Sequence, residues 1–497
     1  MRLLPKFAAL VGFLLLLANA NAQTSADQMS APDTMVDHAA AAFIKDGPWI
    51  GLSVAVVRDN KVRILNYGTT RTDQTLYEIG SVSKTFASLL LARAVEEKKV
   101  KLDDDIRLYL KGDYPNLQYN GNPIRLLHMV NLTSSLPNNL PDWSGLVGKI
   151  ATDSLPFAIV KLNEHYTQDD FLRDLHNVKL DTVPGAMPRH SNTAGALLAL
   201  LLENIYHEPY DQLLSEFLTG ALNMKHTYLS VPADKTGLLA KCYNDKGMPQ
   251  PYIVSNQSAA WSLRSTIGDM ANYMSYQLDE SNAAVKLTHQ PAWGNPASFA
   301  LGFNWFLGSF EGQRVVRTDG TTFGFTSYCL LYPDVHFGVM LMTNECVYNS
   351  SIQDKLYAIG SGIFEKTFFT AAQRSSPAFG YSPPIHALVT ELDKQGWDHA
   401  PECAADLQKK DAGFQLDENE LNVWAYALLR RGEKQKALDI FKLNTALHPE
   451  SWNVYDSEAE GFEDTGDAAN AITYYKRSLE LNPNNTNAVD HLKKLQK

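Results

Sequence analysis

Residues 77–86 read YEIGSVSKTF, and the fold and chemistry of the chain turn on this stretch. Ser81 and Lys84 lie three residues apart, so on a helix they share one face and the amine can approach the hydroxyl. A serine needs such a partner to act as a nucleophile at neutral pH. Burial and the positive end of a helix both lower a lysine pKa, so Lys84 is suited to take the proton. The stretch therefore predicts a serine nucleophile with its proton acceptor at a helix start, where backbone N–H groups can stabilise an oxyanion.

The four-residue motif is weak evidence by itself. A chain of this size contains roughly two Ser-x-x-Lys matches by chance, and Ser83 is equally suited to cap a helix. The sequence holds this one match, and it has no G-x-S-x-G, H-E-x-x-H or Walker-type pattern. The rest of the chain has to decide between a catalytic serine and an ordinary helix start.

Length and composition exclude some classes of function. The chain has 497 residues, of which 45% are hydrophobic, and this is enough to bury a large core. A chain of this length is too long for one ordinary domain, so we expect a large and a small domain. The formal charge is −11, whereas nucleic-acid-binding proteins usually carry a basic patch, so we expect no nucleic-acid partner. The four cysteines lack the spacing of metal ligands, and we expect no metal and no cofactor.

The N-terminus predicts export. Two basic residues precede an apolar run over residues 7–17, and small residues follow up to Ala22, which is the pattern of a signal peptide over residues 1–22. Residues 23–40 form a small, polar N-terminal extension. No later stretch approaches ~20 uninterrupted apolar residues, so we expect no stable membrane anchor. The predicted localisation is periplasmic or secreted.

Residues 41–370 predict one α+β domain. Two apolar runs flank a polar turn in residues 49–68, and the same pattern returns in residues 325–344, so each segment reads as a β-hairpin. Between them, Phe86–Val95 and Thr193–Ile205 fit buried helices. Hairpins at both ends of the segment predict that the terminal strands share one antiparallel sheet, flanked by helices and an all-helical region.

The C-terminal part predicts a small all-α domain. Residues 371–415 start rich in Ser and Pro and read as a linker with helical segments, and residues 416–497 repeat with a period of 34 residues. This is the tetratricopeptide period, in which small residues let paired helices approach and a proline follows the second helix. Two repeats are few for stability, so we expect packing on the main domain or on extra helices from residues 385–415, with protein contact as the default function. The matching pairs are Gly432 and Gly466, Ala437 and Ala471, Phe441 and Tyr475, Leu447 and Leu481, and Pro449 and Pro483.

Seven segments in order resemble the class C β-lactamase and penicillin-recognising serine hydrolase family, which includes D-alanyl-D-alanine carboxypeptidases and esterases. The resemblance covers roughly residues 41–370 and implies the β-lactamase/transpeptidase-like fold, with Ser81 as the acylated nucleophile and Lys84 as its partner. The segments are GLSVAVVRDNKV, YEIGSVSKTFASLLLARAVEE, VPGAMPRHSNTAGALLALLLE, ALNMKHTYL, WSLRSTIGDMANYM, LGFNWFL and DGTTFGFTSYCLLYPDVHFGVMLMTN.

The second motif departs from the pattern of this family. The family has Tyr-x-Asn, whereas the aligned segment reads His190-Ser191-Asn192. By resemblance, Asn192 contacts the lysine and the substrate. An imidazole titrates near pH 6.5 and is a competent general base, but it is shorter than a phenol. A catalytic role for His190, a structural hydrogen bond and a decayed site are the open interpretations.

The third motif of the family, Lys-Thr-Gly, has two candidate positions. The literal string Lys235-Thr236-Gly237 follows a polar stretch without strand alternation, whereas Thr318-Asp319-Gly320 precedes the second hairpin and has the expected strand context. We favour the second position, which puts Thr318 where the family has a cation for a substrate carboxylate. Gly320 permits close backbone approach, and by resemblance the N–H of Thr321 pairs with that of Ser81 as the oxyanion hole.

The sequence predicts an exported serine hydrolase that cleaves an ester, amide or peptide bond through an acyl-enzyme on Ser81. The candidate site consists of Ser81, Lys84 and His190 as catalytic residues, with Asn192, Thr318, Gly320 and Thr321 binding substrate. One alternative is a D-alanyl-D-alanine carboxypeptidase or β-lactamase, in which Arg314 or Arg317 supplies the missing cation. The other is a catalytically impaired binding protein that acts through its repeats. The expected partners are a small-molecule or peptide substrate and a protein bound by the repeats.

Overall fold

The computed structural model describes residues 36–70, 72–254, 258–296, 299–346 and 351–496. The predicted signal peptide and residues 23–35 of the predicted extension lie outside the described residues. Contacts divide the chain into two compact units, and the first extends to Thr370. The second consists of Ala371–Lys497 together with the short segments Asn295–Ala300 and Gly308–Arg314.

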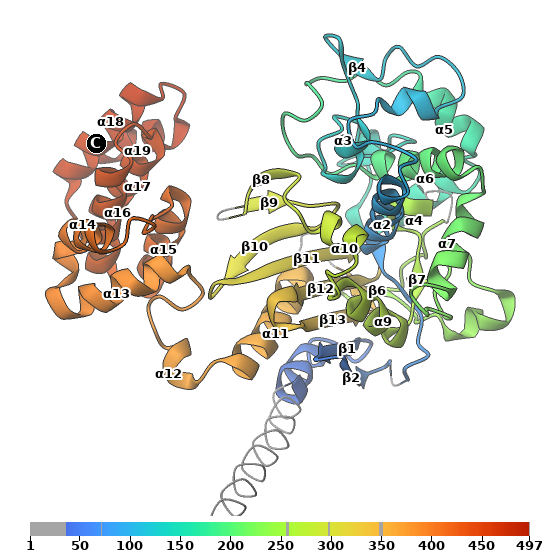
Figure 1. The fold of residues 1–497 in the computed structure, drawn as a ribbon, viewed down its shortest axis with the longest axis horizontal. Helices are drawn as coiled ribbons and strands as arrows, with labels where there is room; N and C mark the ends of the chain where they lie inside the picture. The colour runs from blue at the N-terminus through green and yellow to red at the C-terminus, as the bar shows by residue number, and fades with distance from the viewer. Residues whose placement is uncertain (1–35, 71, 255–257, 297–298, 347–350, 497) are drawn as a thin grey trace, which may run out of the picture. The chain divides into compact units, whose positions relative to one another are not determined.

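An antiparallel sheet is the centre of the first unit (Figure 1). The predicted hairpins are present: Asp59 and Asn60 turn between β1 and β2 with positive φ angles, and a 3₁₀ turn over Pro333–Val335 joins β12 to β13. Strand β1 pairs along its length with β13, so the two hairpins share one sheet as predicted. The strand order is β2 (Lys61–Gly68), β1 (Gly51–Arg58), β13 (Phe337–Thr343), β12 (Thr326–Tyr332), β11 (Gln313–Thr321), β10 (Phe306–Phe310), β9 (Phe299–Leu301) and β8 (Trp293–Asn295).

Helices cover both faces of the central strands. Every residue of β12 and β13 is buried, which requires packing on each face of the sheet. Side chains alternate between the faces of a strand, and a Cβ on Gly338 would meet the Met274 sulfur of α9 (Ile267–Gln277). On the opposite face, Gly360 of α11 (Ser351–Phe368) lies against Leu341. The two helices therefore enclose the centre of the sheet.

A helical region lies beside the sheet and positions the candidate nucleophile (Figure 1). Helix α2 (Ser83–Glu96) is buried over most of its length and packs on α6 (Asn192–Tyr206), α8 (Ser258–Trp261) and α10 (Ala283–Thr288). A helix that is apolar all round belongs in the interior, as these contacts show. The remaining helices of this region are α3 (Leu126–Val130), α4 (Leu155–Asn163), α5 (Gln168–Leu175) and α7 (Tyr210–Thr219).

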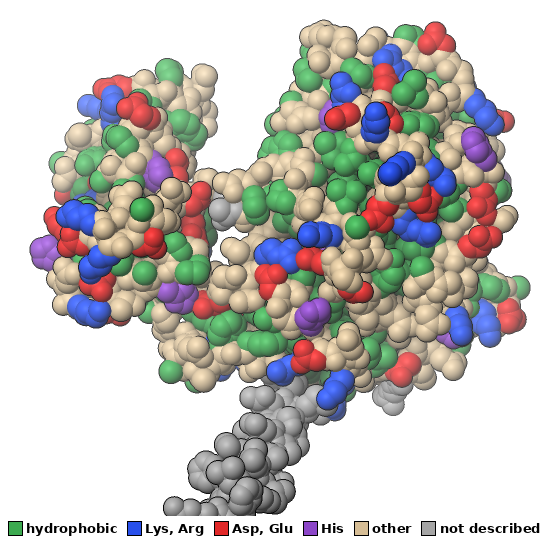
Figure 2. Space-filling view, viewed as in Figure 1, with side chains coloured by type: hydrophobic (Ala, Val, Ile, Leu, Met, Phe, Trp, Pro, Cys, Tyr) green, Lys and Arg blue, Asp and Glu red, His purple; other side chains and the backbone are tan. Residues whose placement is uncertain are grey.

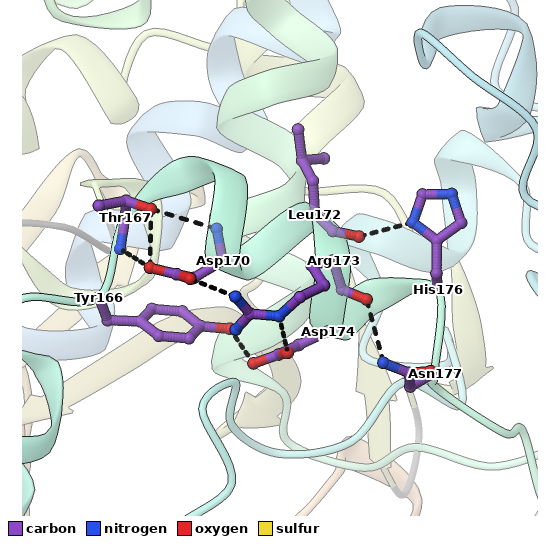
Figure 3. Close-up of polar contacts among 8 residues, drawn as sticks. All are labelled: Tyr166, Thr167, Asp170, Leu172, Arg173, Asp174, His176 and Asn177. Atoms are coloured by element: carbon purple, nitrogen blue, oxygen red, sulfur yellow. Dashed lines mark hydrogen bonds and ion pairs between the residues drawn. The ribbon is translucent and has the colours of Figure 1, made fainter.

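Helix α5 shows how a local sequence sets a helix start (Figure 3). Thr167 and Asp170 form a capping box: the Thr167 hydroxyl accepts from the Asp170 backbone N–H at 3.2 Å, and the Asp170 carboxylate accepts from the Thr167 N–H at 3.0 Å. One turn further, Arg173 pairs with Asp170 and Asp174. The polar side chains of this exposed helix end thus satisfy the backbone and one another, so they form no site of their own.

The described part of the second unit from residue 371 to residue 496 is helical. Its helices run in consecutive packed pairs, with α15 against α16 and α17 against α18. The positions 34 residues apart occupy equivalent places: Gly432 and Gly466 have positive φ angles after α15 and α17, and Ala437 and Ala471 are fully buried. The helices are α12 (Ala371–Arg374), α13 (Pro383–Gln395), α14 (Ala400–Lys410), α15 (Glu418–Arg430), α16 (Lys434–Leu447), α17 (Trp452–Thr465), α18 (Ala468–Leu481) and α19 (Thr486–Leu495).

The residues expected to form a linker with helical segments contribute to the core of the second unit. Helices α13 and α14 bury Ile385, Leu388 and Cys403 in one apolar cluster with Trp424 of α15 and Phe441 of α16. Residues 385–410 thus pack against the helices that follow them. The second unit therefore has a hydrophobic core of its own.

Surface and helix composition bear on the predicted partners. On the visible face of the first unit, acidic and basic side chains are interspersed (Figure 2). Within the described ranges, no helix combines the length and the apolar character needed to cross a bilayer.

Candidate active site

Ser81 lies in a 3₁₀ turn, η1 (Gly80–Val82), that leads directly into α2. The turn approaches β11 so closely that glycines are required on both sides. A Cβ on Gly80, whose φ is +56°, would lie 2.5 Å from the Thr321 nitrogen, and a Cβ on Gly320 would lie 2.8 Å from the Ser81 nitrogen. The predicted pair of backbone N–H groups, those of Ser81 and Thr321, is therefore brought to one place.

The Lys84 amine is buried and faces four polar atoms. Its Nζ lies 2.8 Å from the Ser81 Oγ, 2.8 Å from the Asn192 Oδ1 and 2.8 Å from the Ala260 carbonyl oxygen. The Nε2 of His190 lies further away, at 3.5 Å. The side chain is only 3% exposed, so bulk water does not hydrate the charge.

Burial lowers the pKa of Lys84 to about 7, although the nearby Asp319 opposes this shift. A neutral amine has two hydrogens and one lone pair. The Asn192 and Ala260 oxygens can only accept, so they take the two hydrogens. The lone pair is then left for the Ser81 hydroxyl. This geometry suits Lys84 to remove the proton from Ser81.

His190 lies within reach of the serine and its imidazole is oriented by an asparagine. Its Nε2 is 3.5 Å from the Ser81 Oγ, and its Nδ1 is 2.8 Å from the Asn138 Oδ1. Because that amide oxygen accepts, Nδ1 carries the hydrogen and Nε2 presents a lone pair to Ser81 and Lys84. The imidazole is thus arranged to accept a proton.

Desolvation, and then the charge of Lys84, lower the His190 pKa to about 3. The residue as a whole is exposed, although its Nε2 lies 3.5 Å from both the Ser81 Oγ and the buried Lys84 amine. A positive charge on His190 is unfavourable next to a charged Lys84, because the two like charges repel each other. Near neutral pH, His190 is therefore neutral, and any positive charge of the pair is on Lys84.

Asn192 starts α6 and lies behind the lysine. Its Oδ1 accepts from Lys84, and its Nδ2 donates to the Asn139 Oδ1 at 2.9 Å. Ser191 caps the same helix by accepting from the Ala194 N–H. Asn192 is buried and is not among the residues that line the cavity at Ser81, although the sequence predicted substrate contact.

The third motif lies at Thr318-Asp319-Gly320, on β11 beside Ser81. The literal Lys235-Thr236-Gly237 forms part of a 3₁₀ helix, η5 (Ala233–Leu238), with no buried residue. Thr318 is 3% exposed and is one of the residues that line the cavity, at the position where the resemblance implies a cation. The strand position therefore lies beside Ser81, whereas the literal string lies on a 3₁₀ helix without buried residues.

A cavity of about 170 Å³ opens onto Ser81. Of the predicted site residues, Ser81, Lys84, His190, Thr318 and Thr321 line it. Its full lining consists of Ser81, Lys84, Leu132, His190, Leu301, Asn304, Trp305, Phe306, Thr318, Asp319, Thr321 and Gln353.

Sequence reasoning missed four residues at this site. Asp319 was part of the quoted motif but received no role, and its carboxylate accepts from the Gln353 Nε2 at 2.6 Å. Asn138 and Asn139 orient His190 and Asn192. The segment LPNN at residues 136–139 has no periodicity, so only its amide side chains could have drawn attention to it.

A second cavity, of about 530 Å³, shares Thr321 and Gln353 with the first. Trp143, Trp261 and Phe323 give it aromatic walls, and the rings of Trp261 and Phe323 meet edge to face with centroids 5.8 Å apart. The cavity beside Ser81 therefore adjoins a larger, partly apolar pocket at Thr321 and Gln353.

A serine with a buried lysine at a helix start, next to the edge of an antiparallel strand, defines the class of serine hydrolases that form acyl-enzymes. Residues 36–361 match the family described as beta-lactamase, which is about two thirds of the chain. The chain belongs to this family, and its relatives are serine hydrolases.

Two relatives illustrate the range of the family. A beta-lactamase of Pseudomonas fluorescens is 25% identical over 377 residues, which are 66% of this chain and 98% of that protein. The D-alanyl-D-alanine-carboxypeptidase/endopeptidase AmpH of Escherichia coli K12 is 25% identical over 320 residues, 59% of this chain and 79% of AmpH. The match to protein flp of Staphylococcus aureus MRSA252 spans 63% of the length of that protein.

The fold is shared with a solved structure. The crystal structure of a beta-lactamase/D-alanine carboxypeptidase from Yersinia pestis, complexed with citrate, superposes with a TM-score of 0.55 at 22% identity. It covers 68% of this chain and 98% of the other. The first unit therefore has the β-lactamase/transpeptidase-like fold.

Proposed function

We propose that this chain is an exported serine hydrolase that cleaves an ester, amide or peptide bond through an acyl-enzyme on Ser81. The observation that carries the proposal is the set of contacts of Lys84. Two carbonyl oxygens hold the amine hydrogens, and the Ser81 Oγ lies 2.8 Å from the same nitrogen. A lysine with a pKa of about 7 is a base at neutral pH.

Acylation follows from these contacts. The Ser81 Oγ attacks the carbonyl carbon while its proton moves to the Lys84 amine. The carbonyl oxygen becomes an oxyanion between the N–H groups of Ser81 and Thr321. When the tetrahedral intermediate collapses, the bond to the leaving group breaks. That group takes the proton from Lys84, directly or through His190.

Hydrolysis of the acyl-enzyme again requires a proton acceptor, and both the regenerated Lys84 amine and His190 lie near Ser81. A water that attacks the ester carbonyl has to lose a proton, and the Nε2 lone pair of His190 points at the Ser81 Oγ. We propose that His190 relays this proton to the Ser81 Oγ as the acyl group leaves, and its lowered pKa of about 3 means that it holds the proton only in transit. Asn138 keeps the imidazole in the required tautomer.

A fluorophosphonate probe tests the nucleophile. The wild-type protein should be labelled on a peptide that contains Ser81, and Ser81→Ala should lose the label and at least about 10³-fold of the esterase activity. Ser215→Ala, an exposed serine on α7, is the matched control and should be labelled like the wild type. Equal labelling of Ser81→Ala and wild type would overturn the proposal.

The substrate is proposed to lack an obligatory carboxylate next to the scissile bond. Thr318 provides no cation, and the Arg317 guanidinium donates to the Tyr328 hydroxyl at 2.8 Å and lies over the Phe306 ring. A substrate panel tests this part. Strong penicillin turnover with little hydrolysis of neutral esters would contradict it.

A second candidate function is a D-alanyl-D-alanine carboxypeptidase or β-lactamase, and the names of the relatives favour it. In that case Arg317 or Arg314 has to turn towards the substrate carboxylate. Arg317→Ala and Arg314→Ala should then raise KM for penicillins and D-alanyl peptides and leave neutral esters unchanged. Unchanged KM values in both variants would exclude this route.

We also propose that residues 1–22 are cleaved on export and that residues 416–497 are tetratricopeptide-like repeats that bind a protein. N-terminal sequencing of the mature protein tests the first point, because cleavage should expose Gln23. If no probe labels Ser81, the catalytically impaired binding protein becomes the better account, and the repeats carry the function.

A further inference from the structure

Asp319 is a charged residue in the cavity that the reaction as described does not use. It lies on β11 between Thr318 and Gly320, and strand alternation puts its side chain on the same face as Thr321. It lines the cavity at Ser81 and is held by the Gln353 amide at 2.6 Å. The carboxylate is therefore fixed close to the place where the scissile bond has to lie.

Among the described residues, no Lys, Arg or His side chain forms an ion pair with Asp319, whose carboxylate accepts from Gln353. Arg317 lies on the same face of the strand, but its guanidinium donates to Tyr328 and lies over aromatic rings. Burial raises the pKa of Asp319, and the charge of Arg317, the Gln353 hydrogen bond and the charge of Lys84 oppose that shift. At a pH above this pKa, the carboxylate adds a negative field to the cavity.

The other charges that line the two cavities do not supply a cation for a substrate. Among the described lining residues, Asp153, Asp245 and Asp319 are acidic, and Lys84 and Lys246 are basic. Lys246 donates to Asp153 at 2.7 Å, and Lys84 is the base. The lining is therefore net negative while Lys84 is neutral.

We infer that Asp319 selects substrates by charge, disfavouring a carboxylate next to the scissile bond and favouring a neutral or cationic group there. The inference rests on the proposed function of Ser81 and goes beyond the absence of a cation at Thr318. A missing cation merely fails to attract an anionic substrate. A fixed carboxylate repels it and attracts an ammonium group.

Three acetate esters of matched size test the inference: acetylcholine, 3,3-dimethylbutyl acetate and 4-acetoxybutanoate. A second set carries the same three charges in the acyl part of p-nitrophenyl esters, so that either side of the scissile bond is sampled. The kcat/KM values are measured at about pH 8, well above the ordinary pKa of a carboxyl, because burial raises the pKa of Asp319 and the test needs its ionised form. The wild type should prefer the cationic ester over the neutral one, and the neutral one over the anionic one, in at least one set.

The variants are Asp319→Asn, which keeps the size and an acceptor for Gln353, and Asp211→Asn, the same charge change at an exposed position on α7. Asp319→Asn should reduce the ratio of cationic to anionic kcat/KM by at least about tenfold, equivalent to about 1.4 kcal/mol. Asp211→Asn should leave the ratio within about twofold of wild type. The neutral ester reports any general loss of activity.

The failure of this inference differs from the failure of the proposed function. If Ser81-dependent hydrolysis is present and Asp319→Asn leaves the charge ratio unchanged in both sets, charge selection by Asp319 is wrong. A binding readout covers the case without turnover: 3-aminomethyl- and 3-carboxyphenylboronic acid add reversibly to a reactive serine, and their relative affinities should shift in the same direction. If neither ester nor boronic acid distinguishes wild type from Ser81→Ala, the proposed function falls, and the inference falls with it.

Discussion

The Lys84 amine determines the pH at which Ser81 can react. Its pKa is lowered to about 7, and only the neutral form has the lone pair that accepts the serine proton. We therefore expect kcat/KM for a neutral ester to rise with pH through about 7 and to level off above it. Lys84→Arg, which keeps the charge but does not lose its proton, should reduce kcat/KM by at least about 10³-fold. Lys235→Arg, on the exposed η5, is the matched control, and a flat pH profile would contradict this role.

A second prediction for a single residue concerns the His190 imidazole. As a general base it should contribute about 10²–10⁴-fold, so His190→Ala should lower kcat by that factor. Asn138→Ala leaves the ring but removes the acceptor at Nδ1, and it should cost less. Burst kinetics locate the effect, since slow water attack leaves the acyl-enzyme to accumulate. Wild-type rates in His190→Ala would assign the ring a structural role.

The sequence was informative about residues whose partners are near in the chain. Ser81 and Lys84 were found because one helix turn brings them together, and their 2.8 Å contact is as expected. Asn138 and Gln353 were not found, because their relation to the site arises from tertiary contacts across 52 residues to His190 and 34 residues to Asp319. The reach of His190 to Ser81, at 3.5 Å, likewise required coordinates.

The contact between the η1 turn and β11 makes a prediction at the scale of elements. A Cβ on Gly320 would lie 2.0 Å from the Ile79 carbonyl oxygen and 2.8 Å from the Ser81 nitrogen, so Gly320→Ala has to separate the turn from the strand. That change displaces the Thr321 N–H from the oxyanion position, and losing one such donor costs about 10²–10³-fold in kcat. Fluorophosphonate labelling rates measure the loss, with the melting temperature recorded in parallel.

Gly362 is the matched control for this substitution. It lies within α11, and a Cβ there would meet nothing within 4 Å. Gly362→Ala should therefore keep the labelling rate and raise the stability by roughly 0.5–1 kcal/mol, the usual gain when alanine replaces glycine inside a helix. If Gly320→Ala labelled as fast as Gly362→Ala, the close approach would have no role in the reaction.

Local sequence patterns predicted the elements whose structure depends on residues that are close together in the chain. The hairpins β1–β2 and β12–β13 follow from apolar runs around polar turns, and Asp59 and Asn60 adopt the positive φ angles of such a turn. The short strands β8–β10 carried too few residues for a pattern. The loop containing Asn138 and Asn139 is fixed instead by hydrogen bonds to His190 and Asn192.

The separate core of the second unit leads to a prediction for the whole molecule. Trp424 is fully buried there and donates its Nε1–H to the Pro377 carbonyl oxygen at 3.0 Å. Trp424→Ala should destabilise this unit by about 3–5 kcal/mol. All candidate site residues belong to the first unit, so Ser81 labelling should keep its wild-type rate. Calorimetry follows the two units, and loss of labelling would show that they depend on each other.

Val423, the neighbour of Trp424, is the control for that experiment. It is 57% exposed, and Val423→Ala should change the stability of the second unit by no more than about 0.5 kcal/mol. A similar loss in both variants would mean that Trp424 does not anchor the cluster.

The pairing of β1 with β13 has a consequence for biogenesis. Leu52 lies opposite Thr343, so the ribosome has to deliver nearly 300 more residues before the strand made first meets its neighbour. Until then one edge of β1 is an open template for intermolecular pairing, and closing so long a loop is slow. A newly made chain thus carries an aggregation-prone edge throughout its synthesis, until β13 is complete and the whole sheet can form at once.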